Sequence, residues 1–506
     1  ESRLSGISRT LNKGERWLYR RRFTLPDGFV RGRVLLHFGA TDQIARVSVN
    51  GVEFPAHTGG YLAFSFDITD ALIPGENVIT VEVTDELDHD LAYGKQRKKR
   101  GGMWYTPISG IWQSVWLESV PEVYIRALRI TPSLSSVVME TEGGADEKIV
   151  EIATPDGILT HRFTGSRTEI AIENPKLWSP ESPHLYRFTL KCGEDAVRSY
   201  FALRTVTVDG PRILFNGKPR FFHGLLDQGY YSDGIYLPAS PRGYEWDILE
   251  MKRLGFDTLR KHIKIEPEAF YYFCDLHGMI VFQDLPNSGG YSFLIDTALP
   301  TVGLRRGITH HASKRRRAQF LSDMAGMVHQ LYNHPSVCYY TIFNEGWGQF
   351  DADFHYDRLK ELDPTRVIDT TSGWFFEKKS DVQSEHIYFK ALDLHPDGRP
   401  LVLSEFGGYS CRIDDHAANL TKSYGYKTMT NPADLTESLR RLYLDQVVPM
   451  IGLGLTAAIL TQVSDVEDEI NGLVTYDRQI TKPDGEVMRE IAEKLRAAFA
   501  ESEKMQ

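Results

Sequence analysis

A short apolar segment that ends in a carboxylate sets the strongest limit on how this chain can fold. Residues 337–343 form an unbroken run of apolar, aromatic and β-branched side chains, without the alternation of a half-exposed strand. Such a run is typical of a parallel strand that is covered on both faces. Asn344 and Glu345 follow it directly, so the strand is expected to place a carboxylate at its C-terminal end, where α/β barrels carry their chemistry.

A second segment has the same form. Residues 400–406 are another short buried-strand pattern, and they deliver Glu405 just before Gly407 and Gly408. An isolated Asn-Glu pair occurs by chance in many proteins, but here it coincides with a strand end and with a second glutamate in the same setting. Paired carboxylates of this kind indicate the hydrolysis of glycosides with retention of configuration.

Composition limits the remaining possibilities. A chain of 506 residues exceeds one typical core, so two to four domains are expected. The net charge of -10 gives no reason to expect a nucleic acid as partner. We interpret the basic runs at residues 95–100 and 314–317 as solvated loop or helix faces. The longest apolar stretch, residues 447–460, is interrupted and too short to span a bilayer, which argues against a membrane protein.

The four cysteines are far apart and show no CxxC spacing, so neither a zinc site nor a disulfide framework is predicted. This usage fits a reducing compartment, and we expect a cytoplasmic location. The chain begins at Glu1 without Met, which leaves a trimmed N-terminal signal as the alternative.

The strand patterns divide the first part of the chain into two β-sandwiches. Residues 1–120 show short strand-like runs separated by turn signals, as in a jelly roll, and Trp112 and Trp116 are expected in its core. Residues 121–206 continue with strands at a different rhythm and fit an immunoglobulin-like sandwich. In its proline-flanked turn, Trp178 is expected to dock on a neighbouring element. The expected strands are residues 17–25, 32–38, 44–49, 61–68 and 77–83, then 124–131, 148–152, 168–172, 186–191 and 197–201.

Residues 207–506 alternate between strand and helix patterns, which predicts a parallel sheet closed into a (β/α)8 TIM barrel. The expected strands are residues 221–225, 256–263, 279–284, 337–345, 366–370, 385–388, 401–405 and 455–463. The expected helices are residues 243–254, 267–277, 317–332, 434–448 and 485–499.

In this order, Glu345 ends the fourth strand and Glu405 the seventh, so both side chains face the same mouth of the barrel. A retaining glycosidase needs the two carboxyl groups roughly 5 Å apart, one to attack the anomeric carbon and one to protonate the leaving oxygen. We assign attack to an ionised Glu405 and proton transfer to Glu345. Asn344 is then placed to hydrogen-bond the sugar 2-hydroxyl.

These residues resemble glycoside hydrolase family 2, the β-galactosidase and β-glucuronidase group, over essentially the whole chain. The resemblance is carried by residues 110–117, 215–219, 333–336, 344–345 and 404–407. It implies that Glu345 is the acid/base and Glu405 the nucleophile. It also implies that Arg260 and His262 orient the nucleophile and contact the sugar and that Tyr388 hydrogen-bonds the nucleophile. Each of these three has a structural alternative, since a buried polar side chain can simply complete a network. Further, weaker candidates are Asp227, Asp284, Trp347, Trp374 and His386.

Residues 1–7 resemble a stretch inside the family's first domain, so we expect an upstream portion to precede them.

The last barrel loop bears on the substrate. Residues 471–474 resemble the galactosidase pattern, which makes Asn471 a candidate for substrate binding. The glucuronidase pattern has Asn-x-Lys there to bind a carboxylate, and no lysine occupies that place here. The prediction is therefore an exo-β-glycosidase that favours a galactoside-like sugar, disfavours uronic acids and acts on a small-molecule or oligosaccharide substrate.

Two departures from the β-galactosidase pattern, at residues 460–462 and at Tyr340, leave other neutral sugars open, namely mannoside, glucoside and arabinoside. A catalytically silent sugar-binding or regulatory protein is the alternative class. No cofactor is required, although the resemblance leaves room for a sodium or magnesium ion. Homo-oligomer formation is left open.

Overall fold

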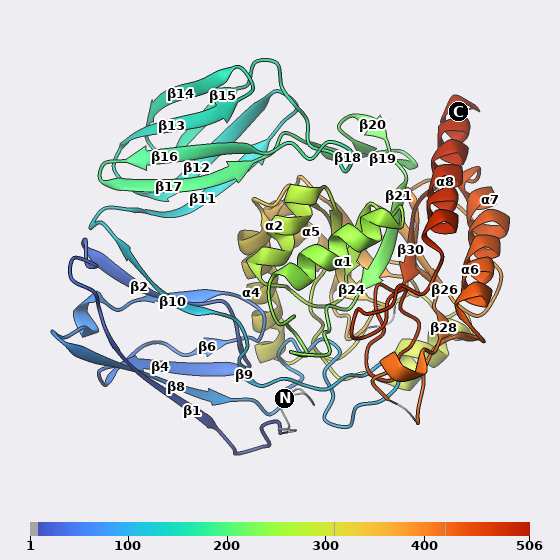
Figure 1. The fold of residues 1–506 in the computed structure, drawn as a ribbon, viewed down its shortest axis with the longest axis horizontal. Coiled ribbons are helices and arrows are strands. Elements are labelled where there is room, and N and C mark those ends of the chain that lie inside the picture. The colour runs from blue at the N-terminus through green and yellow to red at the C-terminus, as the bar shows by residue number, and fades with distance from the viewer. Residues whose placement is uncertain (1–8, 308, 420, 506) are drawn as a thin grey trace.

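The computed structural model describes residues 9–307, 309–419 and 421–505. The expectation for residues 1–7 lies outside this part of the chain. Figure 1 shows two β-sandwiches stacked on one side and a barrel surrounded by helices on the other. Within the described residues, every helix is too short or too polar to cross a membrane.

The first sandwich forms where the sequence predicts it. One sheet pairs β1, β8, β4 and β5, with β6 on β4, and the facing sheet pairs β10, β2 and β7. Alternate side chains of β2 and β4 point inward and form a core around Val34, Leu36 and Val47. Trp112 is buried as predicted, but the prediction for Trp116 is wrong, because its side chain is 46% exposed and stacks on His37. The strands are β1 Trp17–Thr24, β2 Arg33–Phe38, β4 Ile44–Val49, β5 Val52–Glu53, β6 His57–Thr58, β7 Phe64–Asp67, β8 Glu76–Thr84 and β10 Val115–Val120.

The second sandwich has two more strands than predicted, β12 and β14. Its sheets have the orders β11-β12-β15 and β14-β13-β16-β17. A separate antiparallel sheet, β18-β19-β20, lies between this sandwich and the barrel. The bounds are β11 Ile125–Pro132, β12 Ser136–Gly143, β13 Glu147–Thr154, β14 Gly157–Thr164, β15 Arg167–Ala171, β16 Tyr186–Cys192, β17 Asp195–Phe201, β18 Val206–Asp209, β19 Arg212–Phe215 and β20 Lys218–Pro219.

All eight predicted barrel strands are present and pair in parallel in the order β25-β24-β23-β22-β21-β30-β27-β26. The end strands β25 and β26 contact each other, so the sheet curls into a barrel. Nearly all of these strand residues are buried, which explains the unbroken apolar runs. The strands are β21 Phe222–Asp227, β22 Thr258–Lys261, β23 Ile280–Asp284, β24 Val337–Asn344, β25 Val367–Ser372, β26 Gln383–Ile387, β27 Leu401–Gly407 and β30 Leu455–Thr461.

The longer helices follow the prediction with two differences. Helix α5 has no counterpart among the predicted helices, and the helix expected at residues 434–448 is divided by the π-helical segment Leu442–Val447. The main helices are α1 Arg242–Arg253, α2 Glu268–His277, α4 Lys314–Leu331, α5 Ala352–Leu362, α6 Pro432–Arg441 and α8 Gly485–Met505.

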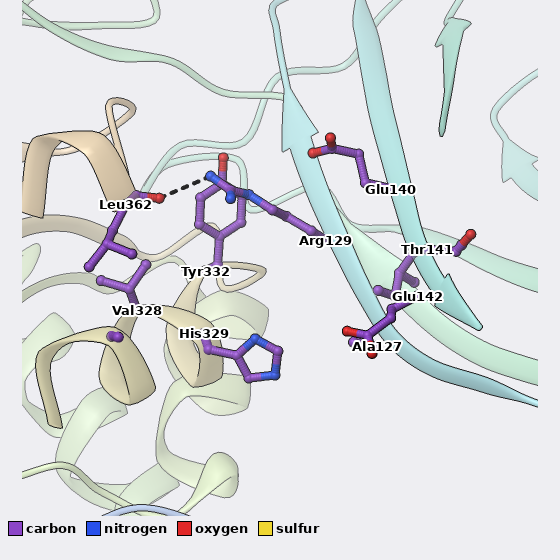
Figure 2. A pocket seen from close by; sticks show the side chains of 11 residues that line it. Ala127, Arg129, Glu140, Thr141, Glu142, Val328, His329, Tyr332 and Leu362 are labelled. Atoms are coloured by element: carbon purple, nitrogen blue, oxygen red, sulfur yellow. Dashed lines mark hydrogen bonds between the residues drawn. The ribbon is translucent and has the colours of Figure 1, made fainter. Parts of the chain in front are cut away.

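A cavity of about 510 Å³ lies between the second sandwich and the ends of α4 and α5. Figure 2 shows Arg129 crossing it to donate a 3.0 Å hydrogen bond to the carbonyl of Leu362, with its guanidinium over the ring of Tyr332. Helices α4 and α5 lead back to the starts of β24 and β25, so this cavity lies at the barrel end opposite Glu345. It is therefore a domain junction and not the candidate active site.

Trp178 fixes the second sandwich to the barrel, as the sequence predicts. Its side chain is fully buried, packs near Phe215 and donates from Nε1 to the carbonyl of Asp275 in α2 at 2.8 Å. We expect Trp178→Ala to destabilise the fold by about 3–5 kcal/mol, the usual cost of a large aromatic cavity. Urea unfolding followed by circular dichroism measures this, with Trp116→Ala as the exposed control. Equal unfolding midpoints for the two variants would contradict the docking role.

Candidate active site

The two predicted carboxylates meet at the C-terminal end of the barrel. Glu345 directly follows β24, and Glu405 lies near the end of β27. One carboxylate oxygen from each, together with a ring nitrogen of His386, lie within 4.8 Å of one another. This spacing fits the separation required for retaining glycoside hydrolysis and leaves too little room for the water that an inverting enzyme places there.

Local backbone geometry turns Glu345 into the mouth. Its φ is 50°, in the left-handed region that few non-glycine residues adopt. Gly346 also has a positive φ, and a Cβ there would lie 2.2 Å from the ring of Phe375. The sharp turn after β24 therefore needs glycine at this position, and it lifts Glu345 from the buried strand to a partly exposed place.

Arg260 is the centre of the polar network beneath the two glutamates. It is 1% exposed and binds both oxygens of Asp284 at 3.0 Å. It also donates at 2.9 Å to Glu405 Oε1, to Asn344 Oδ1 and to the hydroxyl of Ser372. One guanidinium thus links β22, β23, β24, β25 and β27.

Glu405 is held in its ionised form. Burial alone would raise the pKa of this carboxyl, but the charges of His386, Arg260 and His262 hold its pKa below the usual range. Tyr388 adds a short hydrogen bond from its hydroxyl to Oε2. An ionised carboxylate with both oxygens fixed is the arrangement that a nucleophile requires.

His386 lies between the two glutamates. Its Nδ1 is 3.1 Å from Glu345 Oε1, and its Nε2 is 3.7 Å from Glu405 Oε1 and 3.2 Å from Arg260 Nη1. Within the described residues, the trio of Glu345, His386 and Glu405 is the single cluster tight enough to share a metal ion. This trio does not fit a sodium or magnesium ion. Both ions prefer oxygen ligands, and the oxygens of Glu405 already accept hydrogen bonds from Arg260 and Tyr388.

Most of the other predicted residues lie in or beside this network. His262 binds Asp284 Oδ2 at 3.0 Å, and the rings of Trp374 and His386 form an edge-to-face contact. Trp347 packs against Trp104 from the first sandwich. Asp227 is the exception, because it pairs with Lys261 at 2.7 Å in a separate buried network.

Asn471 lies in a group that the sequence analysis did not identify as a whole. It donates to Glu469 Oε1 at 3.0 Å and accepts from Gln462 at 2.7 Å. The other oxygen of Glu469 accepts a short hydrogen bond from Tyr105. Tyr105 belongs to the segment between β8 and β9 (Gly110–Ile111), which leaves the first sandwich and runs across the barrel mouth.

Other residues were also missed. Tyr426 stacks on Tyr388 at 3.9 Å, and Ser372 bonds Asn344 and Arg260. The basic runs each contain a buried member, Lys95 and Arg316, whereas both runs were interpreted as solvated faces. Arg316 ties the loops after β23 and β24 together through the carbonyls of Ser288 and Gly348.

Family comparisons agree with this geometry. Three models match successive parts of the chain: the "Glycosyl hydrolase 2 galactose-binding domain-like" model residues 8–121, the "Glycosyl hydrolases family 2" model residues 127–204, and the "Glycosyl hydrolases family 2, TIM barrel domain" model residues 206–397. The chain belongs to glycoside hydrolase family 2.

Sequence identity to individual relatives of this family 2 chain is low. A β-glucuronidase of Felis catus is 26% identical over 414 residues, covering 72% of this chain and 60% of that protein. A β-galactosidase of Thermoanaerobacter pseudethanolicus is 27% identical over 296 residues, 53% of this chain and 39% of that protein. The chain thus spans less than two thirds of these relatives. The solved β-D-glucuronidase of Dictyoglomus thermophilum has the same fold, with a TM-score of 0.76, 20% identity and coverage of 95% and 90% of the two chains.

The Arg260 network generates a prediction about pH and stability. Arg260→Met leaves Asp284 and Glu405 as neighbouring buried carboxylates, and loss of a buried ionic partner typically costs about 3–5 kcal/mol. The wild-type carboxylates have lowered pKa values, so their stabilising contribution is complete at neutral pH and is lost only as the pH falls through those values.

In the variant, burial raises both pKa values, so stability is lost as the pH increases through the raised values. We therefore expect the deficit in melting temperature relative to wild type to grow between about pH 5 and about pH 8. Arg253→Met, which removes an exposed pair with Glu250, is the control. A deficit that shrinks with increasing pH would refute the role given to Arg260.

Proposed function

We propose that this family 2 chain is a retaining exo-β-glycosidase, with Glu405 as nucleophile and Glu345 as acid/base. The observation that supports this most directly is the approach of their carboxylate oxygens to within 4.8 Å at the barrel mouth. In the first step, Glu405 attacks the anomeric carbon while Glu345 gives its proton to the leaving oxygen. In the second, Glu345 takes a proton from water, and the water oxygen displaces Glu405 from the sugar.

The surrounding residues suit these two steps. Arg260 and Tyr388 hold the carboxylate of Glu405 ionised and in one orientation, which reduces the reorganisation needed for attack. Asn344 is fixed by Arg260 and Ser372 beside Glu345, where it is placed to contact a sugar hydroxyl. The roles of Arg260, His262, Tyr388 and Asn344 are part of the proposal.

On the sugar, the comparisons lead us away from the galactoside-like preference that the sequence predicted. The Felis catus relative and the Dictyoglomus thermophilum structure are named as glucuronidases, and the relative named as a galactosidase matches a smaller part of this chain. We therefore favour a β-glucuronide over a β-galactoside. The missing Asn-x-Lys lysine, which disfavours uronic acids, concerns the last barrel loop alone.

Glu405→Ala should abolish hydrolysis of aryl β-glycosides, because no other group can form the glycosyl-enzyme intermediate. We expect kcat to fall by at least about 1,000-fold, as for other lost nucleophiles. Release of 4-nitrophenol measures this. Glu385→Ala, in the neighbouring strand β26, is the matched control, since Glu385 pairs with Arg305 and lies outside the network. Wild-type turnover by Glu405→Ala would reject the assignment.

Glu345→Ala should still form the intermediate from an aryl glycoside with a good leaving group, which needs little protonation. Its second step should be slow because no base activates water. Added azide, which needs no base, should restore turnover and give a β-glycosyl azide detectable by NMR. An α-glycosyl azide from Glu345→Ala would mean that Glu345 is the nucleophile and Glu405 the acid/base. Rescue of Glu405→Ala by azide, without rescue of Glu345→Ala, would mean the same.

A further inference from the structure

Lys95 is a buried cation beside the active site. It is 8% exposed, and among the described residues no carboxylate oxygen lies within 4.0 Å of its Nζ. Its neighbours in the basic run differ, because Arg100 pairs with Glu467 at 3.0 Å and residues 97–99 are exposed. The ammonium of Lys95 lies over the ring of Trp347, and a largely buried lysine without a carboxylate beside it can take its counter-charge from a ligand.

The backbone around Lys95 is held against the barrel. Gly94 has a φ of 62°, and a Cβ there would lie 2.6 Å from the hydroxyl of Tyr61 and 3.1 Å from the carbonyl of Ile263. The carbonyl of Lys95 accepts from the amide of Tyr105 at 3.0 Å. Gln96 donates to Asp42 at 2.9 Å. The ammonium group is therefore delivered from the first sandwich by a fixed loop.

A buried donor of Trp347 lies next to this ammonium. Lys95 Nζ is 5.5 Å from the ring centre of Trp347, and the indole N–H of Trp347 is buried with no acceptor among the described residues. Trp347 is tied to the acid/base turn, since its amide donates to the carbonyl of Asn344 at 2.7 Å. An unmet buried donor costs about 1–3 kcal/mol, so the indole N–H indicates an acceptor from a ligand beside the Lys95 ammonium.

The charge of Lys95 acts on two groups of the same site. Burial lowers the pKa of His262, which lies 3.9 Å from Glu405, and the positive charge of Lys95 lowers it further. Burial raises the pKa of Glu469, and Lys95 opposes that change. Glu469 is the competing partner for Lys95, but its oxygens already accept from Tyr105 and Asn471.

We propose that Lys95, together with the indole N–H of Trp347, binds the carboxylate of a hexuronic acid whose anomeric carbon lies between Glu345 and Glu405. This rests on the proposed glycosidase function and names its substrate class and its specificity residue. One carboxylate supplies the counter-charge that Lys95 lacks and the acceptor that Trp347 lacks. The first sandwich thereby contributes a lysine, whereas the last barrel loop lacks the lysine of the Asn-x-Lys pattern.

The test compares two substrates that differ only at C6, 4-nitrophenyl β-D-glucuronide and 4-nitrophenyl β-D-glucoside. We expect Lys95→Met to lower the ratio of kcat/KM for glucuronide to that for glucoside by about 100-fold, the scale of a lost charged contact in a buried site. Lys95→Arg should retain much of the ratio. Lys98→Met, in the exposed part of the same loop, is the control and should leave it unchanged.

An unchanged ratio in Lys95→Met, or an equal loss on both substrates, would overturn the proposal, because a counter-charge for Glu469 would affect both alike. If the wild-type protein hydrolyses neither compound, the proposed function fails, and binding then decides the role of Lys95. Calorimetry with D-glucuronate and D-glucose should show weaker glucuronate binding in Lys95→Met than in wild type. Equal glucuronate affinities would refute the site.

Discussion

The buried guanidinium of Arg260 is the interaction on which the site depends. Its partners Asp284, Asn344, Ser372 and Glu405 come from four other strands of the barrel. Each of these polar side chains would be costly to bury without a partner. The bidentate pair with Asp284 offsets the desolvation of the Arg260 guanidinium. The same network that keeps Glu405 ionised also fixes the relative positions of the strand ends.

The different settings of the two glutamates follow from this arrangement. Glu405 lies inside the cationic network and has its oxygens fixed by Arg260 and Tyr388. Glu345 follows its strand, on a left-handed turn, and contacts His386 instead. Two chemically identical side chains can thus take two roles, because one is surrounded by positive charge and the other stands nearer the opening.

The barrel is not the whole of the site. The segment between β8 and β9 brings Lys95 and Tyr105 from the first sandwich to Trp347 and Glu469. Gly94 permits this close approach, since any side chain there would collide with Tyr61. In the proposed function, the first sandwich therefore contributes groups that distinguish one sugar from another, while the barrel supplies the two carboxylates.

Sequence patterns predicted the barrel strands and both glutamates because buried parallel strands leave unbroken apolar runs, and Glu345 and Glu405 end two of them. They could not predict the contacts of Lys95 or Arg316, because burial of one residue in a basic run depends on segments distant in the sequence. Trp116 shows the same limit, since an alternating strand does not reveal which face is covered. Asp227 resembled a site residue by its place at a strand end, but its side chain pairs with Lys261.

The central claim is that the carboxylates of Glu345 and Glu405 lie close enough for attack by one of them on the anomeric carbon. Proton NMR of the first sugar released from an aryl β-glycoside, recorded before mutarotation, tests this directly. The account predicts that the β-anomer appears first, as two successive displacements require. Initial appearance of the α-anomer would mean a single displacement by water and would contradict it.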